Sequence, residues 1–189
     1  MVNLISAGLA IVIARAFSRR DKRRSAVLLF VSGLALSCSP MVLRLAGLFP
    51  ANGAPIVFPT LLSVSLLSLA PMVAASILTS SMIADVVEDS QLRTGRRSEG
   101  LFFAANSFVQ KAVSGIGVFL SGVILSLAHF PQTGALQAGT PVDAEIVRNL
   151  ALLYLPIVVG LYLISMVLLR GYRINRETHE ANLRALAER

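Results

Sequence analysis

The chain has 189 residues, of which 55% are hydrophobic and 14% are charged, whereas an average soluble domain carries about 45–50% apolar and about 25% charged residues. Its net charge of +7 comes from Lys and Arg clusters between apolar runs, and tryptophan is absent, which argues against nucleic acid as a partner. The single cysteine, Cys38, gives no disulfide framework and no metal-binding spacing. The high apolar and low charged content indicates a protein embedded in the lipid bilayer.

The apolar runs predict an all-α fold, a polytopic bundle of about five transmembrane helices. A helix needs about 20 apolar residues to cross roughly 30 Å of hydrocarbon. Four runs reach that length and the first is shorter; the five are residues 2–14, 26–49, 56–84, 101–130 and 150–169. They make one membrane domain, residues 1–170.

The first run resembles a helix whose start is missing. A cleaved signal peptide is the alternative, but its basic residues would precede the apolar core, and here Arg15 follows it. In the third run, Pro59 and Pro71 predict a kinked helix that acts as a hinge. A static kink that improves packing is the alternative there.

The basic residues gather on alternate loops and in the tail. They include Arg15, Arg19, Arg20, Lys22, Arg23, Arg24, Arg93, Arg96 and Arg97. The positive-inside bias then places this side in the cytoplasm, with the N-terminus outside and the C-terminus inside. We expect a multi-pass plasma membrane protein, of the bacterial inner membrane, with a cytosolic tail at 171–189. In the tail, Glu180 and Arg184 at i,i+4 spacing predict a solvated helix.

Lys111 is the strongest functional signal. Counted from Gly100, it lies about 16 Å into the fourth run, near the bilayer midplane. A charge at that depth usually faces a bundle interior or a water-filled cavity and marks a pathway. Polar residues share its half of the helix, and the predicted substrate-binding set is Lys111, Asn106, Ser107, Gln110 and Ser114. Close helix packing is the alternative, but it requires only the Gly and Ser residues.

Lys111 requires a counter-charge, because a buried charge is tolerated only when it is paired or solvated. The five runs hold no Asp or Glu deep within them. We therefore expect the partner to come from outside this chain, as the other half of a larger transporter.

The loop between the third and fourth runs interleaves acidic and basic residues. Opposite charges at neighbouring helix ends could clamp a gate in one state and release it in another, whereas a solvated turn at Thr94 and Gly95 is the alternative. The predicted cytosolic gate comprises Asp85, Glu88, Arg93, Arg96, Arg97 and Glu99.

The order of these features resembles a known family. An AD pair at Ala84 and Asp85, then acidic residues, then TGRRSEG at 94–100 and a polar-faced helix with a central lysine is similar to the glycoside-pentoside-hexuronide:cation symporters, which are melibiose permease-like members of the major facilitator superfamily. The resemblance implies that this chain supplies the last five of twelve helices, in the C-terminal half.

The same resemblance implies sugar or glycoside symport by alternating access, driven by Na⁺ or H⁺. It implies a sugar-binding and coupling role for Lys111, and sugar contacts at Asn106 and Ser107. The family's cation-site aspartates belong to the N-terminal half, so the coupling ion would bind mainly outside this chain, and no other cofactor is expected.

Three alternatives accompany this reading. Distant relatives of the same fold carry a lysolipid, so an amphiphile is the second candidate solute, and it would require an apolar extension of the cavity. A non-transporting truncated half or assembly component is another class. An enzyme is disfavoured, because no HExxH, GxSxG or Walker-type motif is present and neither His129 nor His179 has a ligand set in the sequence.

Overall fold

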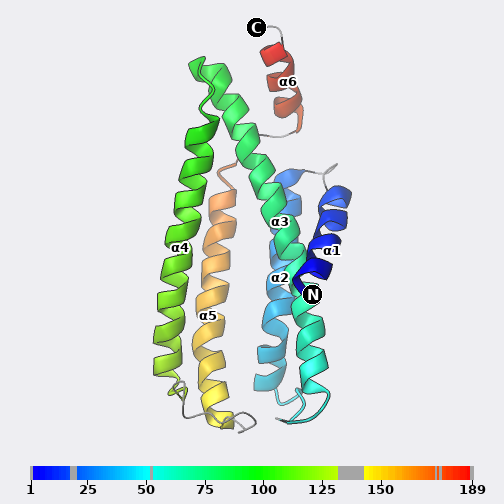
Figure 1. Ribbon diagram of the computed structural model, residues 1–189, viewed down its shortest axis with the longest axis vertical. Coiled ribbons are helices and arrows are strands. Elements are labelled where there is room, and N and C mark those ends of the chain that lie inside the picture. Colours follow the sequence, from blue (N-terminus) through cyan, green and yellow to red (C-terminus); the bar gives the residue numbers. More distant parts are fainter. Residues whose placement is uncertain are drawn as a thin grey trace.

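The computed structural model describes residues 2–17, 21–51, 53–131, 143–172, 174 and 176–187. Throughout this part of the chain the regular secondary structure is helical (Figure 1). The helices are α1 (Val2–Phe17), α2 (Lys22–Leu45), α3 (Val57–Thr94), α4 (Glu99–Leu127), α5 (Ala144–Leu169) and α6 (Arg176–Ala187). The predicted all-α class is confirmed.

Within the described residues, four helices, α2 to α5, are long and apolar enough to cross a membrane, and α1 contributes a shorter apolar helix, Ser6–Phe17. Their bounds differ from those of the apolar runs, because polar residues outside the hydrocarbon can continue a helix. The clearest case is α3, which was expected to end near Ala84 and continues through polar residues to Thr94. It stops at Gly95, whose φ of 70° is left-handed and whose N–H donates to the carbonyl of Gln91.

The best-packed part of the bundle is formed by α1, α2 and α3. Its buried residues are small or aliphatic and comprise Ala10, Ala14, Ala26, Leu29, Ala74, Ala75, Leu78 and Met82. At Gly33 of α2, an added Cβ would lie 2.7 Å from Cγ of Met72 and 3.2 Å from the carbonyl oxygen of Ser68. Small residues allow such close approach of membrane helices, where van der Waals packing replaces the hydrophobic effect.

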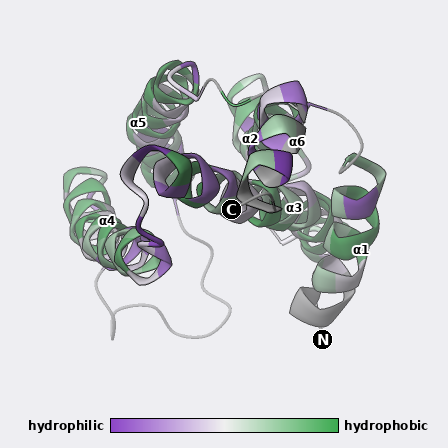
Figure 2. Ribbon diagram, turned by 90° about the horizontal axis from the view of Figure 1, so that it is seen from above, coloured by the Kyte–Doolittle hydropathy of each residue, from purple (hydrophilic) through white to green (hydrophobic). Residues whose placement is uncertain are grey.

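In contrast, α4 and α5 bury few residues and pack loosely against the other three helices. Large apolar residues are exposed on both helices (Figure 2), for example Phe108 at 74% and Val118 at 74% on α4. Surfaces of this kind are stable in lipid or against further helices. One ring contact ties α5 to α2, where Phe30 and Tyr162 meet edge to face with centroids 6.2 Å apart.

The two prolines predicted to bend the third span lie in different environments. Pro59 occupies the first turn of α3, where its missing N–H would have no intrahelical acceptor. Pro71 is buried in the helix interior, where it removes a backbone hydrogen bond. A structural effect on the middle of α3 therefore rests on Pro71 alone.

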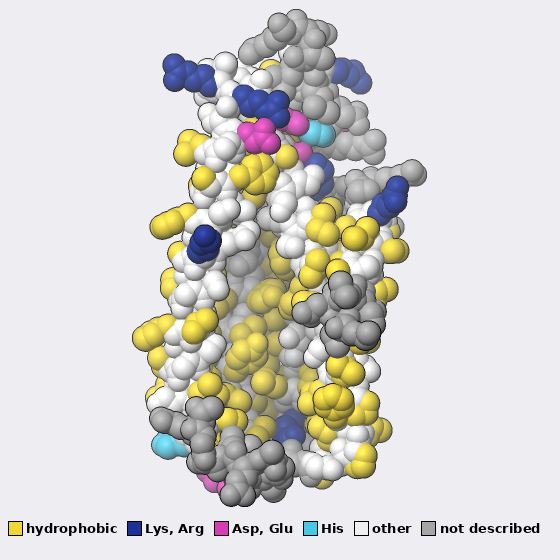
Figure 3. Space-filling view, in the orientation of Figure 1, with side chains coloured by type: hydrophobic (Ala, Val, Ile, Leu, Met, Phe, Trp, Pro, Cys, Tyr) yellow, Lys and Arg dark blue, Asp and Glu magenta, His cyan; other side chains and the backbone are white. Residues whose placement is uncertain are grey.

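The charged residues gather mostly at one end of the bundle, where α2 begins, α3 ends, α4 begins and α5 ends (Figures 1 and 3). The tail forms α6, which packs against α3 at this end. It was expected to be a solvated helix. Arg19, Arg20 and the side chain of Glu180 lie outside the described residues.

Candidate transport site and the charged cluster beside it

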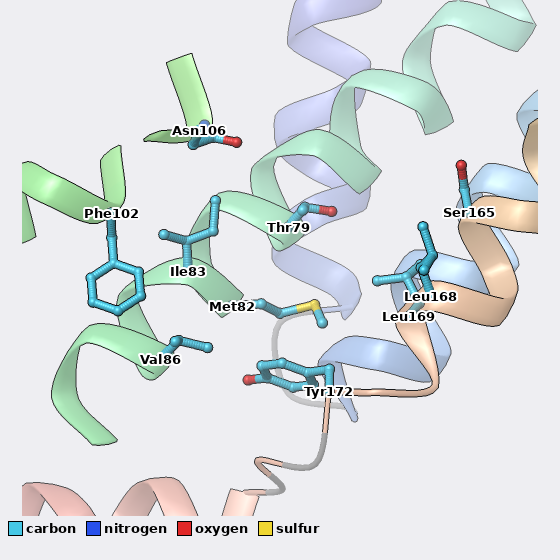
Figure 4. A pocket seen from close by; sticks show the side chains of 10 residues that line it. All are labelled: Thr79, Met82, Ile83, Val86, Phe102, Asn106, Ser165, Leu168, Leu169 and Tyr172. Atoms are coloured by element: carbon cyan, nitrogen blue, oxygen red, sulfur yellow. The ribbon is translucent and has the colours of Figure 1, made fainter. Parts of the chain in front are cut away.

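A cavity of about 440 Å³ lies between α3, α4 and α5. Figure 4 shows side chains from all three helices around it, together with Tyr172, which follows α5. The lining residues are Thr79, Met82, Ile83, Val86, Phe102, Asn106, Ser165, Leu168, Leu169 and Tyr172.

Most of this lining is aliphatic or aromatic. Four polar side chains interrupt it: Thr79, Asn106, Ser165 and Tyr172. A ligand there would meet apolar walls over most of its surface and a few hydrogen-bonding groups, which is the usual composition of a small-molecule pocket.

One member of the predicted substrate-binding set lines the cavity. Asn106 lines it, whereas Ser107, Gln110, Lys111 and Ser114 are exposed on α4. At about 100° per residue, Lys111 lies roughly 140° around the helix from Asn106. The polar face of α4 therefore begins at the cavity and turns away from α3 and α5.

Lys111 makes no ion pair and no side-chain hydrogen bond within the described part of the chain. Its neighbours on the same side of α4, Ser107 and Ser114, are exposed and polar, whereas Val109 and Val113, two residues away in either direction, lie on the opposite side of the helix. This is the environment expected of a lysine whose partner lies on another set of helices or on a bound solute.

Asp85 forms the centre of a charged cluster at the basic end of the bundle. Its side chain is 4% exposed, and Lys22 Nζ lies 2.7 Å from Oδ1 and 2.8 Å from Oδ2. The hydroxyl of Tyr172 donates to Oδ2 at 2.6 Å. The carboxylate therefore joins the first turn of α2, the C-terminal part of α3 and the segment after α5.

Tyr172 also borders the cavity, so the cluster and the cavity share a wall. Burial, and then the hydrogen bond to Asp85, raise the pKa of the Tyr172 hydroxyl far above its ordinary value. The phenol therefore keeps its proton and acts as the donor in its hydrogen bond to Asp85.

His179 of α6 approaches the same cluster. Its Nδ1 lies 3.1 Å from Oε2 of Glu88 and 3.4 Å from Oδ1 of Asp85. The sequence showed no ligand set for His179, and the structure places one possible ligand atom from each of Asp85, Glu88 and His179 within 4.8 Å of the other two. Metal ligands can be spaced this way, but Asp85 is already paired with the Lys22 ammonium. Within the described residues, His179 Nδ1 and Glu88 Oε2 are buried and make no hydrogen bond.

The remaining residues of the predicted gate form local pairs. Arg93 Nε lies 2.9 Å from Oδ2 of Asp89 one turn earlier on α3, and Arg97 Nη2 lies 2.9 Å from Oε2 of Glu99. The side chain of Arg96 is exposed. The ion pairs found for these loop charges in the described part of the chain are local, whereas the pair of Asp85 with Lys22 joins α3 to α2.

Three members of the cluster were not predicted as site residues: Lys22, Tyr172 and His179. The available signal was Asp85 itself, an acidic residue directly after an apolar run, which needs a partner when buried. Choosing Lys22 among the basic residues of its segment requires knowing how α2 packs on α3.

Comparison with curated proteins identifies relatives that are symporters. The chain is 32% identical to a sodium-dependent lysophosphatidylcholine symporter of Gallus gallus over 117 residues, which cover 61% of this chain and 21% of the relative. It is 30% identical to the Homo sapiens counterpart over 115 residues, 60% of this chain and 20% of that protein. An uncharacterized symporter of Synechocystis is 44% identical over 50 residues, 26% of this chain and 9% of the relative.

The aligned part of the chain spans about a fifth of the length of the first of these relatives. No solved structure matches. The relatives are transporters and not enzymes, and with four helices in its described part able to cross a membrane the chain is a multi-pass membrane protein. A family model described as MFS/sugar transport protein matches residues 1–176, and the chain belongs to this family of the major facilitator superfamily.

Proposed function

We propose that this chain forms part of a cation-coupled symporter that works by alternating access, and that its solute is an amphiphile of the lysolipid class. The observation that carries the choice of solute is the composition of the cavity between α3, α4 and α5. An apolar extension of the binding site was the feature required of an amphiphile carrier.

The energetics favour an acyl chain over a sugar along these walls. Each buried methylene contributes about 0.8 kcal/mol. A sugar hydroxyl placed without a hydrogen-bond partner costs about 1 kcal/mol or more. Because apolar side chains such as Met82, Ile83 and Phe102 outnumber the polar ones, most hydroxyls of a sugar would have no partner there.

The head group of such a solute would lie along the polar face of α4. A phosphate pairs well with an ammonium acting as a point charge, and Lys111 is a cation without an ion-pair partner in the described part of the chain. The lysophosphatidylcholine symporters to which the chain is similar support this solute class.

A sugar or glycoside is the second candidate. The observation that favours it is the run of hydrogen-bonding side chains Asn106, Ser107, Gln110 and Ser114 on one face of α4, within a motif that resembles the glycoside-pentoside-hexuronide:cation symporters. These groups, with Lys111, would bind hydroxyls rather than a head group.

We further propose that additional helices complete the site. The described residues place no acidic side chain on Lys111, so its counter-charge and the Na⁺ or H⁺ site would belong to a second half of the transporter. The basic end would face the cytoplasm, in the inner membrane of a bacterium.

The test uses the complete transporter, this chain together with the half that completes it, reconstituted into proteoliposomes. Labelled lysophosphatidylcholine and a labelled glycoside are offered with and without an inward Na⁺ or H⁺ gradient. We expect gradient-dependent accumulation of the lysolipid. Accumulation of the glycoside alone would select the second candidate, and absence of both would indicate a non-transporting component.

A variant of the cavity wall sharpens this test. Ile83→Asn places an amide among apolar side chains and should reduce lysolipid uptake at least tenfold. The matched control is Ile77→Asn on the same helix, where the side chain is 42% exposed and does not line the cavity. Equal effects of the two changes would contradict the assignment of the acyl chain to this cavity.

A further inference from the structure

A second hollow, also of about 440 Å³, lies between the first turns of α2 and the end of α5. Three arginines line one part of it, Arg23 and Arg24 on α2 and Arg170 directly after α5. The remainder is apolar and includes Leu28, Val31 and Met166. It shares only Leu169 with the cavity between α3, α4 and α5.

The three guanidinium groups make no ion pair within the described part of the chain. The nearby anions are engaged elsewhere, since Asp85 binds Lys22 and the carboxylate of Asp21 accepts from the backbone N–H of Arg24 at 2.8 Å. Arg23 and Arg24 also occupy the first turn of α2, where the helix dipole disfavours cations. Three like charges in that position favour binding of an anion.

The apolar part of the hollow continues along an exposed surface of the bundle. Leu28 is 54% exposed and Val31 is 41% exposed. At 1.5 Å per residue, Val31 lies roughly 10–12 Å deeper along α2 than the two arginines. An occupant that satisfies both parts must carry a negative charge at the end of the bundle and a hydrocarbon chain beside it.

We propose that this hollow is a binding site for an anionic phospholipid of the leaflet that contacts the basic end of the bundle. The phosphate and any acidic head group bind Arg23, Arg24 and Arg170, while one acyl chain lies along Leu28 and Val31 between α2 and α5. Basic pockets between transmembrane helices recognise anionic lipid head groups in this way. A soluble phosphate would satisfy the arginines but would leave the apolar surface unoccupied.

Because the sequence contains no tryptophan, lipid binding at the hollow can be followed by the fluorescence of a single introduced tryptophan. Leu28→Trp places one fluorophore in the hollow. Ile164→Trp is the matched control, since Ile164 lies at a similar depth on α5, is 58% exposed and does not line the hollow. The full chain carrying either substitution is reconstituted into nanodiscs that contain brominated phosphatidylglycerol or brominated phosphatidylcholine at equal mole fraction.

We expect brominated phosphatidylglycerol to quench the tryptophan fluorescence of the Leu28→Trp variant at least twofold more than brominated phosphatidylcholine does. In the Ile164→Trp variant, we expect the two brominated lipids to quench the fluorescence equally. Changing Arg23, Arg24 and Arg170 together to Gln should remove the preference seen with Leu28→Trp. Circular dichroism and gel filtration of the same samples show whether the triple variant folds. If it does not fold, the single Arg170→Gln variant takes its place, and it should halve the preference for phosphatidylglycerol.

Two results would overturn the proposal. Equal quenching of the Leu28→Trp variant by the two lipids would show that the hollow does not select anionic lipid, and the same preference in both tryptophan variants would show general enrichment around the protein. A third arm adds millimolar inorganic phosphate, which we expect to leave the preference intact. If phosphate abolished the preference for phosphatidylglycerol, the arginines would be assigned to binding of a soluble anion instead.

Discussion

Lys22 Nζ lies 2.7 Å from Oδ1 of Asp85, so the first turn of α2 is joined to a buried carboxylate 63 residues later in the chain. The two side chains differ in exposure to solvent, since Lys22 is 25% exposed and Asp85 is 4% exposed. The lysine can be solvated when α2 and α3 separate, whereas the carboxylate in its present position depends on Lys22 and Tyr172.

This asymmetry gives the first prediction, which concerns Asp85→Asn. Removing one partner of a buried ion pair costs about 3–5 kcal/mol, and we expect the lower end, about 3 kcal/mol, because Lys22 keeps contact with solvent. The measurement is the free energy of unfolding of the purified chain in detergent, followed by circular dichroism. Adding Lys22→Met to Asp85→Asn should recover part of the loss, because it removes the ammonium left without a partner.

The matched control is Asp89→Asn, which removes a carboxylate from the same helix. Asp89 pairs with Arg93 across one turn, and the Arg93 side chain is 76% exposed. Such a pair contributes about 0.3–0.5 kcal/mol. Similar losses for the Asp85 and Asp89 variants would show that burial adds nothing to the cluster.

Much of the fold followed from the sequence because the bilayer imposes a simple length criterion on apolar runs. Four of the five predicted spans correspond to helices that can cross a membrane, and the first corresponds to the shorter α1. The continuation of α3 to Thr94 was not predicted, because hydropathy reports where lipid ends and not where hydrogen bonding along the backbone ends. Gly95 was the only local signal for the stop.

The candidate site was less accessible to prediction. The 100° periodicity placed Asn106 and Lys111 on one polar face, but it could not show that the cavity reaches only as far as Asn106. The contacts of Asp85 join residues that are 63 and 87 positions apart. Contacts at such separations depend on helix packing, which local patterns do not encode.

The second prediction concerns orientation. We expect the basic end of the bundle to face the cytoplasm, because basic loops are retained on that side. Thr94→Cys and Ala51→Cys place exposed thiols at opposite ends, in a background where the buried Cys38 is changed to Ala. In intact cells, an impermeant thiol reagent should label the Ala51→Cys variant and spare the Thr94→Cys variant until the membrane is permeabilised. The reverse pattern would invert the topology.

The third prediction concerns the loop arginines. Arg96 and Arg97 lie at the end of the bundle, far along α4 from Lys111, so their charges should affect conformational switching more than solute affinity. Surface pairs such as Arg97 with Glu99 contribute about 0–1 kcal/mol, so single Gln variants should change uptake by less than about fivefold, and the double variant should lower turnover further.

The assay for these variants is initial uptake rate against solute concentration in the complete transporter. We expect kcat to fall and KM to stay within about twofold of the parent value. A double variant with strongly raised KM and unchanged kcat would place these arginines in solute binding and would refute their role in a gate.

The fourth prediction is that Lys111 requires both its charge and its shape. In the complete transporter, Lys111→Ala should abolish gradient-driven accumulation, because no cation would remain on the polar face of α4 to bind a head group or a carboxylate of the other half. Lys111→Arg should retain only part of the activity, since a guanidinium is a planar fork and an ammonium is a compact point donor.

Membrane insertion should survive both substitutions at Lys111. An ionised side chain near the bilayer centre costs about 2.5–3.5 kcal/mol on insertion scales, so Lys111→Ala makes α4 easier to insert. The measurements are therefore expression level in the membrane and solute accumulation by vesicles with and without a cation gradient. Phe108→Ala, on the exposed apolar face of α4, serves as the control for a general disturbance of the helix. If Lys111→Ala accumulated solute at the parent rate, the lysine would be a tolerated surface charge, and neither solute candidate could be assigned to this face of α4.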